Sequence, residues 1–193
     1  VEGGADTDLF SFWGGSQESS VDLTDKEDGY VLASQGNSEV RIKGIEVYLG
    51  AKDAKTTFTG DANHRGSIFV AGDAGAVFNL KGGDTAYGRE GVKDVFNVSI
   101  HVPTEAASWT EQEKIDYLNT NRIFIRGKID AIDDVFVDGV KFNGNTLTAT
   151  AAPARAWMQD FMWQSNAVLS GSSTFGTVYP KAHWVAGAAP YYG

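Results

Sequence analysis

Short runs of alternating hydrophobic and polar residues, separated by glycines, recur along this chain. In 96–102 the apolar residues Phe96, Val98, Ile100 and Val102 alternate with polar ones. Such an alternation predicts β-strands with one buried face. We expect further strands at 30–33, 39–49, 67–71, 76–80, 122–131, 135–142, 146–150, 174–179 and 183–185.

The connections between these runs predict how neighbouring strands join. Asp138-Gly139 lies between two apolar runs, and this dipeptide favours the two-residue turn of a β-hairpin. The loop 72–75 also has hairpin length, so we expect 67–71 and 76–80 to pair. In 39–49 the apolar phase shifts by one residue at Gly44, which indicates a β-bulge or a strand that bends from one sheet to the other.

Two segments have helical rather than alternating patterns. The first is 108–119, where Ser108 with Glu111, or Thr110 with Glu113, matches the capping box that begins many helices. The second is 154–164, which follows Pro153 and places its large apolar residues on one side. We expect this second helix to pack on the sheet, with docking to a partner as the alternative.

The predicted strands show no regular alternation with helices. No sequence repeat of the length used by solenoid proteins is visible, which argues against that class. We therefore predict an all-β fold: an antiparallel β-sandwich, jelly-roll-like, with two short helices. A chain of 193 residues fits a single domain of this class. We expect residues 1–20 to form an N-terminal arm and 21–193 to form the sandwich.

Composition narrows the class of partner. The net charge is −9, the pI is about 4.7, and no long cluster of Lys and Arg is present, so we expect no nucleic-acid binding. No apolar run has the length of a membrane span. The chain has no cysteine, which leaves its redox compartment open. Its start at Val1 is compatible with processing by removal of a signal, a pro-segment or Met.

We find no catalytic motif. Neither the Gly-x-Ser-x-Gly elbow nor the phosphate-binding loop occurs, and His64, His101 and His183 have no neighbours at metal-ligand spacing. We therefore expect a protein that is not an enzyme. A glycosidase that uses two of the many carboxylates stays open as a weaker alternative.

Two groups of acidic residues are candidate calcium ligands, because calcium binds several oxygens from flexible loops. The competing interpretation is a solvated acidic loop in each case. The first group precedes Gly29 and consists of Asp25, Glu27 and Asp28. The second group surrounds a predicted strand end and consists of Asp130, Asp133 and Asp134. We expect no other cofactor.

Aromatic residues at both ends of the chain are candidate contacts with other molecules. The apolar cluster within residues 9–13 either packs on the core of its own chain or docks on a neighbouring subunit. The expected interface residues are Leu9, Phe10, Phe12, Trp13, Trp157, Phe161, Tyr191 and Tyr192.

These features together indicate a non-enzymatic structural subunit of a viral or extracellular assembly, of the capsid or surface-fibre type, that associates with itself or with other structural subunits. The pattern resembles that of single jelly-roll capsid proteins. We expect the protein in the virion or outside the cell. The alternative is a module that binds carbohydrate or a cell-surface ligand by stacking on aromatic residues. Its candidate residues are Trp109, Trp184, Tyr191 and Tyr192.

Overall fold

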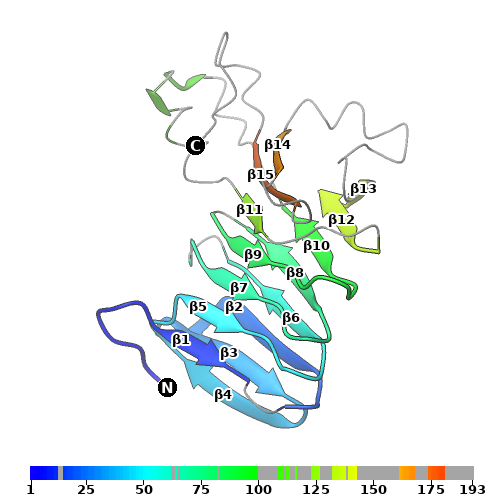
Figure 1. Ribbon diagram of the computed structural model, residues 1–193. Coiled ribbons are helices and arrows are strands. Elements are labelled where there is room, and N and C mark those ends of the chain that lie inside the picture. The colour runs from blue at the N-terminus through cyan, green and yellow to red at the C-terminus, as the bar shows by residue number, and fades with distance from the viewer. Residues whose placement is uncertain are drawn as a thin grey trace.

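The structure of the protein, which is a computed structural model, contains two β-sheets that share one core (Figure 1). Sheet 1 has seven strands in the order β1-β5-β7-β9-β11-β15-β14, and sheet 2 has eight in the order β13-β12-β10-β8-β6-β2-β3-β4. The strands are β1 (Leu9–Ser11), β2 (Ser19–Glu27), β3 (Tyr30–Gln35), β4 (Ser38–Ile42), β5 (Val47–Leu49), β6 (Thr56–Thr59), β7 (Ile68–Val70), β8 (Ala76–Leu80), β9 (Thr85–Tyr87), β10 (Val95–Val98), β11 (Ile123–Arg126), β12 (Asp134–Val137), β13 (Val140–Phe142), β14 (Phe161–Ala167) and β15 (Thr174–Pro180).

The structure describes most of the N-terminal half of the chain and parts of the rest. The side chains of 25–26, 126, 137, 140, 142, 161–167 and 174–180 are not described. The described residues are 1–12, 15–61, 64, 66–81, 83–99, 108–110, 112–113, 116, 123–126, 132–137, 139–142, 161–167 and 174–180.

The chain winds between the two sheets as a parallel β-helix. Each coil places one strand in sheet 1 and the next in sheet 2, in the pairs β1–β2, β5–β6, β7–β8, β9–β10 and β11–β12. Within each sheet the five strands of these pairs are parallel to one another. In Figure 1 the strands of sheet 1 lie to the left of the strands of sheet 2 from the same coil.

Antiparallel hairpins extend the sheets beyond the stacked coils. The strands β3 and β4 add to sheet 2 beside β2, at the N-terminal end of the stack. At the other end β13 pairs with β12, and β15 and β14 add to sheet 1 beside β11. The parallel part of each sheet is therefore flanked by antiparallel strands, on one side in sheet 1 and on both sides in sheet 2.

A column of phenylalanines fills the space between the sheets. Phe58, Phe78 and Phe96 occupy the same register position in β6, β8 and β10 and are fully buried. Their rings stack, with centroids 5.5 Å and 5.1 Å apart and interplanar angles of 16° and 7°. Phe69 of sheet 1 stacks on Phe58 at 5.0 Å and joins the two sheets. Alternation along each strand supplies these inward residues, and the parallel register aligns them.

The polar neighbours of this column form a second ladder on the outside of sheet 2. Asn79 and Asn97 follow Phe78 and Phe96 by one residue, so they point to the opposite face. The Asn97 amide donates to Asn79 Oδ1 at 2.9 Å, and the Asn79 amide donates to Thr59 Oγ1 at 3.2 Å. Adjacent coils are thus joined by side chains as well as by main-chain hydrogen bonds.

The predicted antiparallel jelly-roll sandwich is wrong. The sheets are mixed, and five strands of each are parallel. Parallel strands usually need a helical crossover, so the lack of regular helices favoured antiparallel pairing. Here each crossover runs through a strand of the opposite sheet instead.

The objection to a solenoid is also overturned, because the coils differ in length. In sheet 1, Val47 pairs with Ile68, and Ile68 pairs with Thr85. The partner of Thr85 in the following coil is Phe124. This last step along the chain is about as long as the two preceding steps together. A search for a fixed period does not detect repeats whose spacing varies this much.

Three local predictions also change. The run 39–49 divides at Gly44, whose φ is +67°, so that β4 belongs to sheet 2 and β5 to sheet 1. Of the two alternatives, the chain therefore changes sheets here. The loop 72–75 joins β7 and β8 of different sheets and makes no hairpin. The second predicted helix is contradicted at its end by strand β14, and 154–160 lie outside the described residues.

Other predictions are confirmed. The segment 135–142 forms the antiparallel hairpin of β12 and β13, and Gly139 has a φ of +81°. In the first predicted helix the second capping register is present. Glu113 Oε2 accepts from the Thr110 N–H at 2.7 Å, and Thr110 Oγ1 accepts from the Glu113 N–H at 3.3 Å. The predicted strands 146–150 and 183–185 lie outside the described residues.

Candidate functional site

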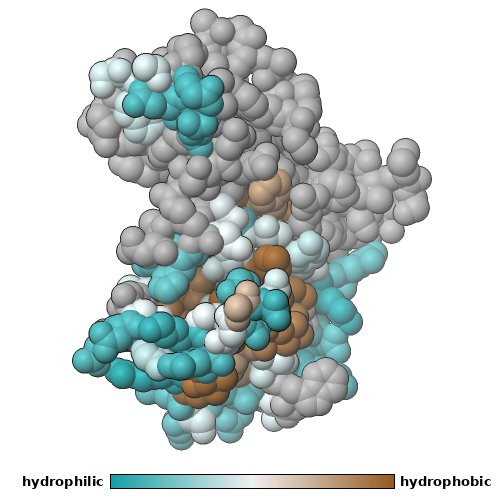
Figure 2. Space-filling view, turned by 90° about the vertical axis from the view of Figure 1, so that its left-hand side faces the viewer, coloured by the Kyte–Doolittle hydropathy of each residue, from teal (hydrophilic) through white to brown (hydrophobic). Residues whose placement is uncertain are grey.

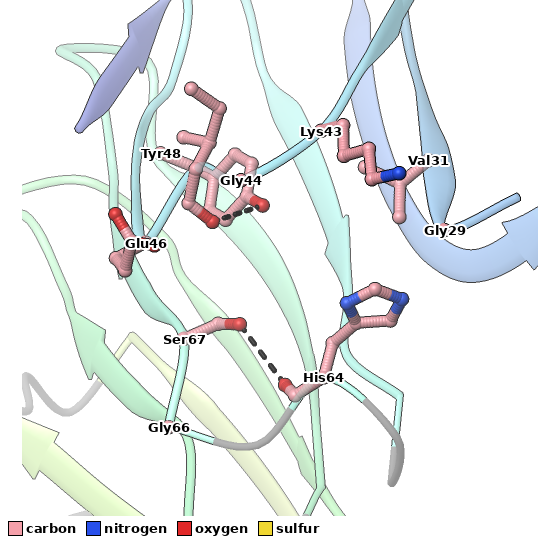
Figure 3. A pocket seen from close by; sticks show the side chains of 10 residues that line it. Gly29, Val31, Lys43, Gly44, Glu46, Tyr48, His64, Gly66 and Ser67 are labelled. Carbon is pink, nitrogen blue, oxygen red and sulfur yellow. Dashed lines mark hydrogen bonds between the residues drawn. The ribbon is translucent and has the colours of Figure 1, made fainter. Parts of the chain in front are cut away.

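A small pocket lies near the N-terminal end of the coil stack (Figure 3). It is bounded by the turn between β2 and β3, by the segment between β4 and β5, and by the loop before β7. Its volume is about 170 Å³. The lining residues are Gly29, Val31, Lys43, Gly44, Ile45, Glu46, Tyr48, His64, Gly66 and Ser67.

Several polar side chains of this pocket bind main-chain groups. Lys43 Nζ donates to the Asp28 carbonyl at 2.8 Å and lies 5.3 Å from the centre of the Tyr30 ring. Tyr48 donates its hydroxyl to the Ile45 carbonyl at 2.7 Å, and burial raises the pKa of this phenol, which stays neutral. Figure 3 shows the His64 ring and Lys43 on one side of the space and Glu46 on the other.

This arrangement has neither the size nor the geometry of a substrate site. Pockets for small molecules usually measure about 300–1,000 Å³. Ser67 donates to the main-chain carbonyl of His64 at 3.1 Å and not to its ring, so the pair is not a nucleophile with its general base. The pocket has room for a few water molecules or a small ion.

A second hollow lies beside β2, β3 and β6 of sheet 2 and has a volume of about 290 Å³. Its walls are polar, and they include one carboxylate, Glu18, and one ammonium group, Lys55. Ser19, also in its lining, donates its hydroxyl to the Gln17 carbonyl at 3.0 Å. A hydrolase of sugars needs two opposed carboxylates, and this lining contains one.

The first predicted calcium group lies at the hairpin between β2 and β3. Glu27 is exposed and forms an ion pair with Arg41 at 3.6 Å. Asp28 is in the left-handed region, with a φ of +55°, and its carbonyl accepts from Lys43. The side chain of Asp25 is not described. The Glu27 carboxylate and the Asp28 main-chain carbonyl thus each contact a basic side chain.

The second predicted group is divided between the core and the surface. Asp133 is buried, and its Oδ1 accepts from the Asp94 N–H at 2.8 Å. Asp134 contacts Lys93 at 2.8 Å and Lys141 at 2.9 Å, and these lysines hold its pKa below the usual range. Asp130 lies outside the described residues. In the part of the chain that the structure describes, no three His, Asp or Glu side chains gather as metal ligands.

Two buried acids that the sequence did not single out stand at the corners of the coils. Asp84 and Asp94 are each 0% exposed and directly precede β9 and β10. Burial raises the pKa of Asp84 to about 8 and that of Asp94 to about 6. Their carboxylates accept hydrogen bonds from main-chain N–H groups at the turns, including that of Lys81 at 2.9 Å. An aspartate directly before a strand, after a glycine-containing turn, was the available signal.

The contacts of Asp94 show that this residue fastens one coil to the next. Asp94 Oδ1 accepts from the Ala76 N–H at 2.8 Å, and Oδ2 accepts from the Arg89 N–H at 2.6 Å. Asp94 also donates its own N–H to Asp133, so three successive coils are connected. Perturbed acids often mark active sites, but neither Asp84 nor Asp94 lines the two pockets described above. We infer a structural role for both.

Replacing Asp94 with Ala is expected to lower the free energy of unfolding by about 2 kcal/mol, because the buried N–H of Ala76 and the partly buried N–H of Arg89 lose their acceptor. Chemical denaturation followed by circular dichroism measures this loss. The control is Asp73→Ala, which removes a half-exposed partner of the Arg89 side chain and should cost under about 1 kcal/mol. Equal losses in the two variants would contradict the fastening role.

The comparisons with known proteins add no identity. No family model, curated protein or solved structure matches this chain. Among the described residues, no helix combines the length and hydropathy that a membrane span requires.

Of the predicted interface residues at the N-terminus, Phe10 and Phe12 pack on the chain's own core. Strand β1 pairs in parallel with β5, and Phe12 is 7% exposed. The rings of Phe10 and Phe12 meet edge to face at 5.0 Å. Leu9 is 55% exposed. The remaining predicted contacts are not described: Trp13, Trp157, Tyr191 and Tyr192 lie outside the described residues, and Phe161 is described only as part of the backbone of β14.

The outer faces of the two sheets differ in character. On sheet 2 the outward positions of the parallel strands are mainly polar and include the ladder of Thr59, Asn79 and Asn97. On sheet 1 they are mainly apolar. We call this second surface the sheet 1 face; it consists of Leu9, Ser11, Val47, Leu49, Ile68, Val70, Thr85 and Tyr87.

Proposed function

We propose that this protein is a non-enzymatic structural subunit that assembles with itself in an extracellular or virion setting. The observation that carries the proposal is that acidic side chains are buried while apolar side chains point outward on one face. The buried acids hold the main chain at the coil corners, whereas the sheet 1 face presents apolar side chains outward. Contact sites between proteins are often formed by outward apolar patches.

The stacked coils also suit a building block. Ring stacking in the core and the amide ladder outside join consecutive coils, so force applied along the stack is distributed over many contacts. Aligned columns of this kind favour a rigid body whose faces keep their shape. A rigid body with an apolar face suits contact with another copy.

Carbohydrate binding by exposed aromatic residues is the competing role. Of its four candidate residues, Trp109 is half-buried and the other three lie outside the described residues. Neither pocket has a described tryptophan or a pair of carboxylates in its lining. Self-assembly is therefore the better supported role.

The test is the native mass of the full chain in solution, measured by analytical ultracentrifugation across a wide range of protein concentration. We expect the average mass to rise with concentration. A chain that stays monomeric throughout would overturn the proposal. Repeating the measurement with a chelator tests the acidic groups, since a fall in mass would show that a divalent cation contributes to the contact.

A further inference from the structure

We propose that the sheet 1 face binds the same face of a second copy of this chain, and so forms the lateral contact of the assembly. The inference rests on the proposed self-assembly and identifies the surface responsible. Figure 2 views the molecule from the side of sheet 1 and shows hydrophobic residues gathered between hydrophilic segments.

The register of sheet 1 aligns the apolar residues in two columns. Leu9, Val47 and Ile68 share one position in β1, β5 and β7. Two residues further along, Leu49, Val70 and Tyr87 share another position, in β5, β7 and β9. The residues between them, such as Tyr48 and Phe69, are buried, so both columns point outward.

Exposure shows that this surface is incompletely covered. Leu9 is 55% exposed and Tyr87 is 42% exposed, and both are among the few large apolar side chains of the described residues with such exposure. Val47, Leu49, Ile68 and Val70 are half-buried. A partner that covered them would remove further apolar area from water.

The distribution of charge favours a second copy as the partner. The whole chain carries a net charge of −9, so two copies repel each other wherever charged surfaces meet. None of the outward side chains of β1, β5, β7 and β9 is charged. Two copies that meet through this face bury apolar residues against apolar residues, and the charged residues lie at its margins: Asp8 and Glu46 directly precede β1 and β5, and Arg126 of β11 is beside Tyr87 in register. A two-fold pairing of this kind uses the same patch on both subunits.

The N-terminal end of the stack is less suited to contact between copies. Its edge strand in sheet 2 is β4, where the side chains of Glu39 and Arg41 are exposed. The amino group of Val1 donates to the Arg41 carbonyl at 2.8 Å, and the Lys43 N–H donates to the Val1 carbonyl at 3.0 Å. Charged and covered edges block the pairing of strands between molecules. The sheet 2 edge at this end is therefore protected from pairing between molecules.

The size of the face sets the expected strength. The face spans four parallel strands of 3 residues each. A strand spacing of roughly 4.8 Å and a rise of roughly 3.3 Å per residue give it a flat area of roughly 200 Å². A stable complex usually buries about 800 Å² on each partner. We therefore expect weak, concentration-dependent association of the chain.

The first experiment places a charge on the face and measures the self-association constant of the full chain. Val70→Glu and Val70→Lys should each weaken association tenfold or more, because either charge would be buried unpaired at the contact. The matched controls are Thr57→Glu and Thr57→Lys, at an outward position of β6 in sheet 2, and these should leave the constant unchanged. Circular dichroism and thermal melting must show that every variant is folded.

The second experiment needs no buried charge. Because the chain lacks cysteine, a single introduced cysteine is a unique label site. The maleimide labelling rate of Tyr87→Cys should fall severalfold at high protein concentration, whereas that of Thr59→Cys should not change.

The outcomes separate the two proposals. A chain that remains monomeric overturns both this inference and the proposed function. If association persists in the Val70 variants and Tyr87→Cys is labelled at the same rate at all concentrations, the self-assembly stands and the sheet 1 face is not its contact. If the Glu variant alone weakens association, the effect is net charge and this inference is overturned.

Discussion

Replacing Phe78 with Ala should lower the free energy of unfolding by about 3–5 kcal/mol, the usual cost of deleting a buried aromatic ring. Phe78 is the central member of the internal stack, with Phe58 on one side and Phe96 on the other. Its removal leaves a cavity between three coils that are already aligned in register. Denaturant unfolding followed by circular dichroism gives the loss directly.

The neighbouring position provides the control. Val77 precedes Phe78 in β8 and is half-buried on the outer side of sheet 2. Val77→Ala shortens a side chain of the same strand without opening the core, and we expect it to cost under about 1.5 kcal/mol. If the two variants lost similar stability, the ring column would not be the main source of cohesion between the coils.

Replacing Asp84 with Asn should raise stability at pH 8 by several kcal/mol and leave it nearly unchanged at pH 4. Burial raises the pKa of Asp84 from 3.8 to about 8. Between these two pH values the carboxyl is protonated in the folded protein and ionised in the unfolded chain, so folding takes up a proton. Stability from this group is complete below pH 3.8 and is lost as the pH rises to 8, at up to about 1.4 kcal/mol per pH unit. Asparagine stays neutral and keeps an oxygen that can accept from the Lys81 N–H.

Unfolding free energies at several pH values between 4 and 8 test this expectation. The wild-type curve should fall most steeply below pH 6, where Asp94 titrates as well, and the Asp84→Asn curve should be flatter up to pH 8. Asp61 raises the Asp84 pKa and Lys81 lowers it, so both must be retained. The control is Asp73→Asn, whose half-exposed carboxylate contacts Arg89. A wild-type slope preserved in Asp84→Asn would contradict this assignment.

The sequence identified several strands but not their partners. The segments 76–80 and 174–179 were predicted as strands, and the structure has β8 and β15 there. The hairpin at Asp138-Gly139 was predictable because its turn is coded locally. Alternation alone carries no information about whether a neighbouring strand is parallel, so the pairing of β8 with β6 and β10 was out of reach.

Short strands were missed for a related reason. β6 and β9 contain four and three residues, too few for a period of two to be distinguished from chance. Their place is fixed by the coils above and below them. The fold of this chain is thus determined largely by contacts between coils.

The buried acids were invisible for a different reason. Asp84 and Asp94 were two among 25 acidic residues, and the sequence does not state which of these are buried. Sequence reasoning grouped acids by proximity along the chain and so selected Asp133 and Asp134. The structure gives these two different surroundings. The side chain of Asp133 is buried, whereas that of Asp134 lies between two lysines.

The unequal turns between coils have a consequence for how such a chain changes over time. The connection from β8 to β9 is the short segment 81–84, whereas that from β10 to β11 is the much longer 99–122. Each of these strands nevertheless keeps its place beside its parallel neighbours. The ladder thus accommodates a long connection at 99–122, so genetic variation in length should accumulate at such bends. Descendants of one ancestor could then differ in outline and decoration while sharing an unaltered shaft.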